Sequence, residues 1–439
     1  FWVVAGQHPF NFPAYVLASL QVSEAYNAGM YTTGKTSEVV WGVFLWTALV
    51  ALLVLRRRTT HAGPWSNTLP LLFILFVMLL TWKMGIVRHQ GHINKFFVPM
   101  ATIRFFLPFT THIDDRKRWA LVGLSALVVV TGASGYFIVK SSSPADQAVR
   151  TGRRLIGVVN QTIALPRVYE GRSKRLRQYR SLYGLPEIQT RIENETVDIF
   201  SANQATVIFN RLNYHPRPVF QGYQACTPEL QRWNGDFYRG ENAPRYILNV
   251  PALTPIDNRY PASEDAEALK ALFSHYRPVL FERGMYLFER VDTSPPVAPP
   301  VDVRNERKIM GEWVELDPDH KHWRLLALDL QPTWRGQLRG IAYKLPELRM
   351  TIRFDDGQEQ AFRVNIGSIE TGFILDPFFG VLDSLDAWPL GTGAKRFTAV
   401  QVSLIPPDHW AVKAEYEMEM RTIAPLATSS QTASYGSDN

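Results

Sequence analysis

Residues 39–55, VVWGVFLWTALVALLVL, form an apolar run that stops at three consecutive arginines, Arg56, Arg57 and Arg58. A helix of about 20 mostly apolar residues is long enough to cross the hydrocarbon core of a bilayer. Basic residues directly after such a helix are typical of its cytoplasmic end. The run therefore predicts a membrane-spanning helix, and the chain is expected to be an integral membrane protein.

Three further apolar stretches lie close to the first. Residues 66–82, SNTLPLLFILFVMLLTW, and residues 119–139, WALVGLSALVVVTGASGYFIV, contain no charged side chain. Residues 96–111, FFVPMATIRFFLPFTT, are shorter and carry Arg104, whose charge is costly inside a bilayer unless it is paired or faces a cavity. Together the four stretches predict an α-helical transmembrane bundle of about four spans over residues 37–140.

Basic loops set the expected orientation of this bundle. With four spans, residues 56–58 and 116–118 lie on the same side, which the positive-inside rule makes cytoplasmic. The long region after the bundle is then extracytoplasmic. If residues 96–111 do not cross the membrane, that region becomes cytoplasmic instead.

Two segments flank the predicted bundle. Residues 1–36 mix aromatic and small residues with Gln, Asn and Pro, which favours an interfacial segment over a further span. The chain begins at Phe1 without the basic stretch of a signal peptide, so it is expected to be the C-terminal part of a longer protein. Residues 141–180 form a basic connector whose side chains either contact anionic headgroups or face solvent; they are Arg150, Arg153, Arg154, Arg167, Arg172, Lys174, Arg175, Arg177 and Arg180.

The remainder of the chain has the pattern of a soluble protein. Strand-like and helix-like stretches alternate over residues 181–292, which predicts a small α/β domain. Within it, TPELQRWNGDFYRG has a Thr cap followed by Pro, and a hairpin is expected at Gly284. Short period-2 strands over residues 303–424 predict a C-terminal β-sandwich. A Pro-rich linker at 293–302 separates the two domains, and a disordered tail is expected at 425–439.

Composition excludes some classes of protein. The 439-residue chain carries a net charge of +7, which a membrane protein with basic loops accounts for, so no nucleic-acid partner is expected. The single cysteine, Cys226, excludes an intrachain disulfide. Neither GxGxxG nor GxxxxGK[ST] is present, so no nucleotide cofactor is predicted.

The first candidate site is WKMGIVRHQGHINKFF, residues 82–97. Its basic and histidine side chains collect at one expected membrane interface, where they would bind a lipid-linked phosphate, with His as donor or proton carrier. Simple anchoring by snorkelling Lys and Arg is the alternative. No carboxylate lies nearby in the sequence, so no metal is predicted. The predicted phosphate-binding residues are Lys83, Arg88, His89, His92, Lys95 and Arg104.

The second candidate site is YHPRPVFQGYQACTPELQRWN, residues 214–234, together with the polar residues of 256–269. Polar and aromatic side chains held between prolines suit a sugar or an acceptor. The alternative is a structural loop in which Arg217 pairs with a carboxylate and the aromatic residues lie in the core. The predicted sugar or acceptor surface comprises Arg217, Gln221, Tyr223, Asn234, Asp257 and Arg259.

Two other features have less specific signals. Glu264 and Asp265 would supply paired carboxylates for acid–base chemistry, but with Ser263 they also match a helix cap and first turn. Cys226 precedes a predicted helix, although a lone thiol is usually a buried structural residue. The catalytic residue therefore stays unknown.

The stretches GQHPFNFPAYVLASLQVSEAYNAGM (6–30), 82–97, 214–234 and IDNRYPASEDAEAL (256–269) resemble a group of bacterial multispanning membrane proteins. The architecture of that group is similar to the C-terminal half of GT-C glycosyltransferases. This resemblance implies a bacterial cytoplasmic-membrane protein that takes part in sugar transfer from a polyprenyl-phosphate donor. The catalytic carboxylate of GT-C enzymes lies in an N-terminal outer loop that is absent here, so no catalytic residue is carried over.

Two functions are therefore expected, and they belong to different classes. The first is GT-C-like transfer in cell-envelope glycan assembly, with the bilayer and a polyprenyl-phosphate-linked sugar as partners. The alternative is a non-catalytic, membrane-anchored protein that binds a glycan or a protein partner. A transporter is disfavoured because the predicted spans show no inverted repeat.

Overall fold

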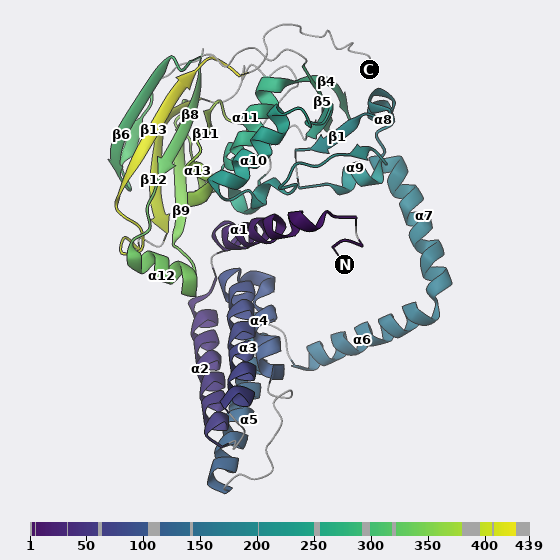
Figure 1. The fold of residues 1–439 in the computed structure, drawn as a ribbon, viewed down its shortest axis with the longest axis vertical. Coiled ribbons are helices and arrows are strands. Elements are labelled where there is room, and N and C mark those ends of the chain that lie inside the picture. The colour runs from purple at the N-terminus through teal and green to yellow at the C-terminus, as the bar shows by residue number, and fades with distance from the viewer. Residues whose placement is uncertain are drawn as a thin grey trace. The chain divides into compact units, whose positions relative to one another are not determined.

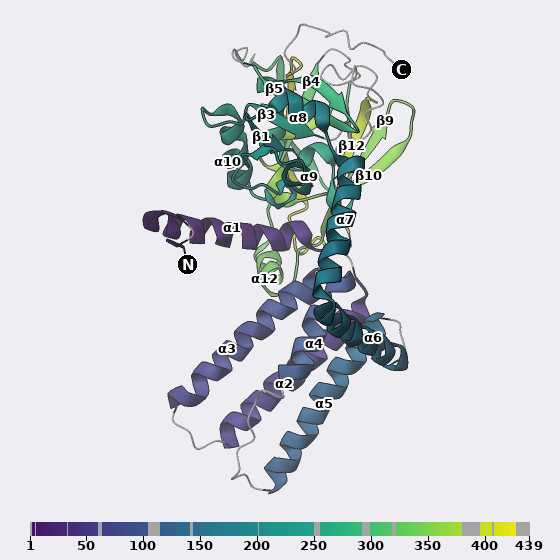
Figure 2. The same cartoon turned by 90° about the vertical axis from the view of Figure 1, so that its right-hand side faces the viewer.

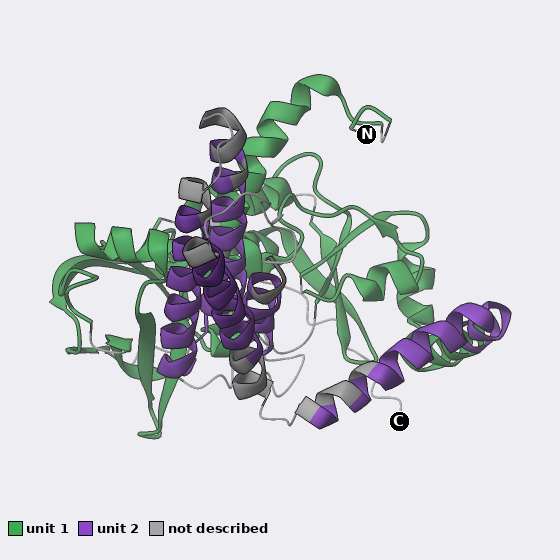
Figure 3. Ribbon diagram, turned by 90° about the horizontal axis from the view of Figure 1, so that it is seen from below, with its two compact units in different colours: residues 1–29, 173–439 green, residues 30–172 purple. Residues whose placement is uncertain are grey.

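A computed structural model describes residues 2–4, 6–32, 34–59, 64–103, 115–140, 144–200, 202–249, 255–291, 299–317, 322–379, 396–405 and 408–426 (Figure 1). The chain divides into two compact units (Figure 3). Unit 1 comprises Phe1–Gly29 and Ser173–Asn439, and unit 2 comprises Met30–Arg172.

The regular secondary structure of unit 2, within its described residues, is helical. Its apolar helices pack against one another, with α2 and α4 both contacting α5, and they bury side chains such as Leu45, Phe96 and Val128. A π-helical turn at Lys83–Val87 follows α3 directly. The helices are α2 (Thr36–Thr59), α3 (Pro64–Trp82), α4 (Asn94–Ile103), α5 (Asp115–Lys140), α6 (Pro144–Ile163) and the start of α7 (Leu165–Tyr183), which continues into unit 1.

The prediction of about four membrane spans is wrong. Within the described residues, Thr36–Leu55 is the one helical segment long and apolar enough to cross a bilayer, with a mean hydropathy of 2.2. Leu71–Val87 and Arg118–Ala133 are apolar but fall short of the about 20 residues that a span needs. A multi-pass arrangement is thus not supported, and the extracytoplasmic placement inferred from four spans loses its basis.

The predicted third span lies only partly within the described residues. Residues 96–111 were expected to cross, but α4 ends at Ile103, and Arg104 and the residues that follow it lie outside the described part of the chain. Pro99 stands inside α4, where it removes one backbone donor. The basic connector predicted at 141–180 is helical, as α6 and α7.

The α/β part of unit 1 is built on a five-stranded sheet in the order β2-β1-β3-β5-β4. Strand β1 runs parallel to β2 and β3, whereas β5 pairs antiparallel with β3 and β4. The predicted hairpin turns at Gly284, where φ is +77°. The strands are β1 (Thr196–Ile199), β2 (Asn213–Tyr214), β3 (Tyr246–Asn249), β4 (Tyr276–Glu282) and β5 (Met285–Arg290).

Helices cover both faces of this sheet (Figure 1). One core contains Ile188 and Val207 against Val197 and Leu248. On the other face, buried residues such as Leu272 join a larger core that continues into the next domain. The helices are α8 (Pro186–Ile192) and α9 (Ala205–Phe209) on the first face, and α10 (Pro228–Arg239) and α11 (Ala266–His275) on the second.

Residues after the linker form two antiparallel four-stranded sheets, consistent with the predicted β-sandwich. Their orders are β10-β9-β12-β7 and β11-β8-β13-β6, and residues of both sheets share one core. The elements are β6 (Asp302–Ile309), β7 (Trp313–Glu315), β8 (Trp323–Asp329), α12 (Trp334–Ala342), β9 (Glu347–Phe354), β10 (Glu359–Val364), α13 (Ile366–Ile369), β11 (Phe373–Asp376), β12 (Phe397–Ile405) and β13 (Glu415–Ile423).

The helix α1 (Phe12–Met30) lies in the segment predicted to be interfacial. Its amide side chain at Gln21 donates to Glu229 over 2.7 Å, and Val22 packs against a small cluster around Leu230. Large apolar side chains elsewhere on the helix, including Leu17 and Leu20, stay exposed. The C-terminal half of α1 is therefore held on unit 1, while apolar surface remains uncovered.

Replacing Phe273 by Ala tests whether the α/β domain and the sandwich unfold together. The Phe273 ring on α11 lies 5.1 Å from the Trp323 ring on β8 and 5.0 Å from the Phe379 ring. We expect a loss of about 3–5 kcal/mol in the free energy of unfolding, because a large buried ring is removed from a shared core. Urea unfolding of the chain in detergent, followed by fluorescence and circular dichroism, measures it.

The matched control is Phe220→Ala, because the Phe220 side chain is 47% exposed. This variant should lose less than about 1 kcal/mol. Two separate unfolding transitions in Phe273→Ala, with only one of them shifted, would contradict a shared core.

Candidate functional site

The structure brings a histidine and a carboxylate together in unit 2. His89 is fully buried, and its Nδ1 lies 2.8 Å from Oε2 of Glu38, in the first turn of α2. His89 follows the π-helical turn. Its φ is 56°, and that of the next residue, Gln90, is 51°. Non-glycine residues with such backbone angles are uncommon and cluster at functional sites.

The expectation that no carboxylate lies near this cluster is wrong. Glu38 precedes the predicted first span, and no local spacing links it to His89. Only the packing of α2 beside the turn after α3 brings the two side chains together. A carboxylate on Nδ1 fixes the tautomer and orientation of an imidazole, which is the arrangement that prepares a histidine for proton transfer.

Three other members of the predicted phosphate site gather near His89. Arg88 donates to the carbonyl of Met30, and the Thr32 hydroxyl donates to the Arg88 carbonyl, so this arginine secures the start of unit 2. Nζ of Lys95 lies 3.0 Å from Nδ1 of His92. Partial burial and the charges of Lys95 and Arg88 lower the pKa of His92. The charges around His92 are thus positive, as an anion site requires.

The two remaining predicted members of the phosphate site are Lys83 and Arg104. Lys83 lies in the π-helical turn and is half-buried. Arg104 lies outside the described residues. Among the described residues, no group of three or more His, Cys, Asp and Glu side chains is placed to hold a metal ion.

In unit 1 the central residue of the predicted sugar surface is buried. Arg217 is 2% exposed and lies between two carboxylates, with its Nη1 3.1 Å from Asp198 and its Nε 2.9 Å from Asp265. Nη1 also donates to the Ile199 carbonyl over 2.8 Å. The Tyr238 hydroxyl donates to Asp198 over 2.8 Å. The guanidinium therefore joins the end of β1, the loop after β2 and the turn before α11.

Burial and neighbouring charges shift the pKa values of this network in opposite directions. Burial raises the pKa of the Asp265 carboxyl to about 6, although Arg217 and a hydrogen bond from Asn234 favour its ionised form. Burial lowers the pKa of Arg217, but Tyr238, Asp198 and Asp265 outweigh it, so the pKa lies above its ordinary value. The arginine thus stays charged, and Asp265 is the group that can gain a proton.

Asp265 also stands in the N-cap position of α11, where its φ is 53°. The sequence indicated a helix cap here, but the carboxylate makes no cap hydrogen bond and accepts from Arg217 and Asn234 instead. Its neighbour Glu264 pairs with Arg259 over 3.1 Å, and burial raises the pKa of Glu264 to about 7. The two neighbouring carboxylates therefore face different arginines.

Other residues predicted for the sugar or acceptor surface hold α1 in place. The Arg259 side chain is 4% exposed and donates to the carbonyls of Gly29 and Tyr223 over 2.6 and 2.9 Å. Arg363 also donates to the Gly29 carbonyl, over 2.9 Å, and lies 3.7 Å from Asp257.

The last three residues of that predicted surface bond within unit 1. The Tyr223 hydroxyl donates to the Gln221 side chain over 2.7 Å. Buried Asn234 accepts from Val219 and donates to Asp265. Arg217, Asn234 and Arg259 are thus interior, and a ligand-binding role for this set stays a prediction.

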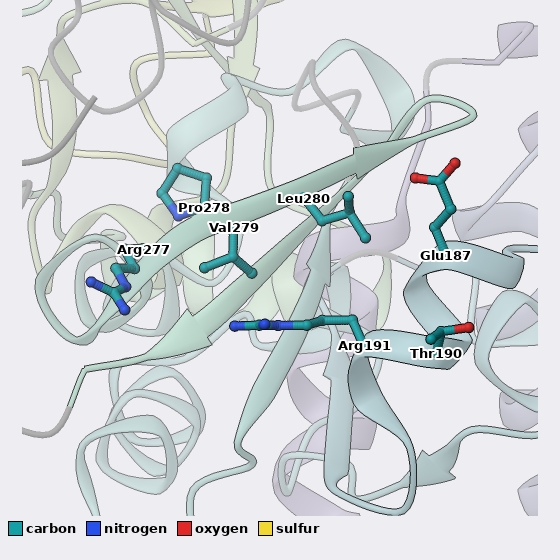
Figure 4. Close-up of a pocket in the computed structure, with 7 residues that line it drawn as sticks. All are labelled: Glu187, Thr190, Arg191, Arg277, Pro278, Val279 and Leu280. Atoms are coloured by element: carbon teal, nitrogen blue, oxygen red, sulfur yellow. The ribbon is translucent and has the colours of Figure 1, made fainter. Parts of the chain in front are cut away.

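A groove that the sequence did not indicate lies between α8 and the edge strand β4 (Figure 4). It has a volume of about 730 Å³. The guanidinium of Arg191 lies 3.0 Å from Glu289, and Arg277 is a second exposed cation of the groove, next to the apolar residues Pro278, Val279 and Leu280. The lining residues come from two distant segments, so no spacing could reveal them; they are Glu187, Thr190, Arg191, Arg277, Pro278, Val279 and Leu280.

Comparison with protein-family models and with curated proteins finds no match to this chain. The resemblance to GT-C glycosyltransferases therefore stays a prediction from the motifs alone.

Replacing Arg217 by Met tests the buried network and its dependence on pH. The variant leaves Asp198 and Asp265 buried without a cation, so we expect a loss of about 3–5 kcal/mol at pH 7.5. The loss should be smaller near pH 5, because protonation of Asp265, whose pKa is about 6 already in the intact network, removes the unpaired charge. Urea unfolding at the two pH values measures both quantities.

Arg232→Met, at an exposed position on α10, is the control and should cost less than about 0.5 kcal/mol at either pH. An Arg217→Met loss that is equal at both pH values would show that packing, and not charge, is what this residue contributes.

Proposed function

We propose that this chain is a membrane-attached protein that binds the phosphate of a polyprenyl-phosphate-linked sugar and takes part in GT-C-like cell-envelope glycan assembly in the cytoplasmic membrane of a bacterium. One observation supports this most directly. Arg88, His92 and Lys95 gather beside the buried His89–Glu38 pair, at the end of an apolar helix. Membrane attachment is supported by the apolar helical segment Thr36–Leu55.

Each residue of the cluster has a role in this proposal. Lys95 binds the phosphate oxygens, since charge-assisted hydrogen bonds from a cation to phosphate are short and strong. His92, whose pKa is lowered, accepts from Lys95 at Nδ1 and donates to the phosphate as a neutral ring from Nε2. Arg88 supplies positive charge and keeps the segment around Thr32 in place. His89 is the proton carrier, oriented by Glu38.

A non-catalytic binding role is the second candidate, and a specific observation favours it. The carboxylates of Asp198, Glu264 and Asp265 are each committed to an arginine inside unit 1. They are therefore poorly placed to act on a substrate in solution. The groove between α8 and β4 would then bind an acidic glycan, with Arg277 facing its carboxylate.

Lys95→Gln tests the phosphate site. We expect about tenfold weaker binding of a polyprenyl-phosphate-linked sugar in detergent micelles, because one charge-assisted hydrogen bond is lost. Intrinsic tryptophan fluorescence measures the affinity, and the same polyprenol without its phosphate provides the baseline. Lys35→Gln, at an exposed lysine of the same unit, should bind like the unchanged protein. Equal affinity for the phosphorylated and unphosphorylated lipid would show that this cluster does not bind the phosphate.

Arg277→Ala tests the groove. We expect about tenfold weaker binding of a carboxylate-bearing oligosaccharide, because an exposed cation of the groove is removed. Calorimetric titration measures the change, with Arg232→Ala on α10 as the control. If neither the unchanged protein nor the control binds such oligosaccharides, the second candidate is excluded for this class of glycan.

A further inference from the structure

Helix α12 packs closely against the sandwich at Gly336. A Cβ added at Gly336 would lie 1.8 Å from the carbonyl oxygen of Ala411, so the helix backbone rests directly on that segment. The Thr333 hydroxyl caps the helix at Gly336 and donates to the Trp410 carbonyl over 2.6 Å. Arg339 forms an ion pair with Asp408 on the same segment. The position of α12 is therefore fixed on its inner side.

Its outer side is apolar and exposed. Trp334, Leu338 and Ile341 recur at the i, i+4 and i+7 spacing of one helix face, and they are 66%, 57% and 69% exposed. Trp410 stands next to the helix and is 48% exposed. Large apolar side chains of a surface helix normally face the core, so this helix is turned the opposite way.

The helix α1 lies on the same side of unit 1 as α12 (Figures 1 and 2). Its exposed apolar residues include Tyr15, Leu17 and Leu20, which are 55%, 63% and 61% exposed. Two helices from distant parts of the sequence thus lie on one side of the same unit, and each carries exposed apolar and aromatic side chains.

The side chains of α12 indicate which partner contacts this side of unit 1. The helix contains no acidic residue, and Arg335 adds an exposed cation that lies over the Trp334 ring at 5.2 Å. Tryptophan beside arginine is typical of the boundary between headgroups and acyl chains, and anionic lipids attract the cation. A helical segment of span length, Thr36–Leu55, belongs to the same chain, so a bilayer is the apolar surface within reach.

We propose that α12, together with the exposed apolar residues of α1, docks unit 1 on the surface of an anionic bilayer. Trp334, Leu338 and Ile341 enter the interface, and Arg335 contacts the headgroups. The docking rests on the membrane attachment in the proposed function, but it does not depend on the phosphate ligand or on sugar transfer.

Depth-dependent quenching in vesicles tests this docking with the full chain. In a Cys226→Ser background, a polarity-sensitive fluorophore is attached at Leu338→Cys, and nitroxide-labelled lipids act as quenchers. We expect about twofold or greater quenching by shallow nitroxides in vesicles that contain phosphatidylglycerol. Arg335→Glu should reduce this quenching in those vesicles more than in pure phosphatidylcholine, since the attraction to anionic headgroups is reversed.

Two further label positions separate the outcomes. Thr190→Cys on α8, exposed on another part of unit 1, should stay unquenched by lipid and open to aqueous iodide. Ala51→Cys, exposed within the apolar helix α2, should be quenched by deep nitroxides. Quenching at Ala51→Cys without quenching at Leu338→Cys would overturn the docking proposal while membrane attachment stands. Absence of quenching at both positions would overturn docking and membrane attachment together.

Discussion

Two carboxylates, Asp198 from β1 and Asp265 from the turn before α11, hold the guanidinium of Arg217 inside unit 1. Each of these charges alone would be costly in the interior, so the three have to be placed together. This requirement fixes the loop after β2 against the carboxyl ends of the parallel strands. It also gives Asn234 and Tyr238 of α10 their partners, so the position of that helix depends on the same charges.

A second pair of arginines extends the same principle to the start of the chain. Arg259 and Arg363 both donate to the carbonyl of Gly29, the last residue of unit 1 before unit 2 begins. Arg259, one of the residues that the sequence offered as a sugar surface, therefore joins distant segments of unit 1. The surface that remains open is of a different kind, with an arginine-lined groove beside α8 and apolar residues on α1 and α12.

Local signals predicted much of the secondary structure. The Thr227–Pro228 start of α10 and the turn at Gly284 appear where the sequence indicated them, because caps and positive-φ turns depend on a few adjacent residues. The number of spans was wrong because, within the described residues, Thr36–Leu55 is the one helical segment that is both long and apolar enough to cross a bilayer. Ser263, Glu264 and Asp265 matched a helix cap and first turn, and α11 does begin here, but Asp265 makes no cap hydrogen bond because a buried arginine is a stronger partner than the helix amides.

The sequence by itself determined the apolar character of residues 39–55, the division into an apolar part, an α/β part and a β-rich part, and the basic residues of 82–97. These properties follow from composition and short-range periodicity. Only the tertiary structure decided that Glu38 meets His89, that Arg217 is buried between two carboxylates, and that α12 turns its apolar face outward. Such pairings join residues far apart in the chain, and they are selected by the cost of burying a charge or by the close approach of two backbones.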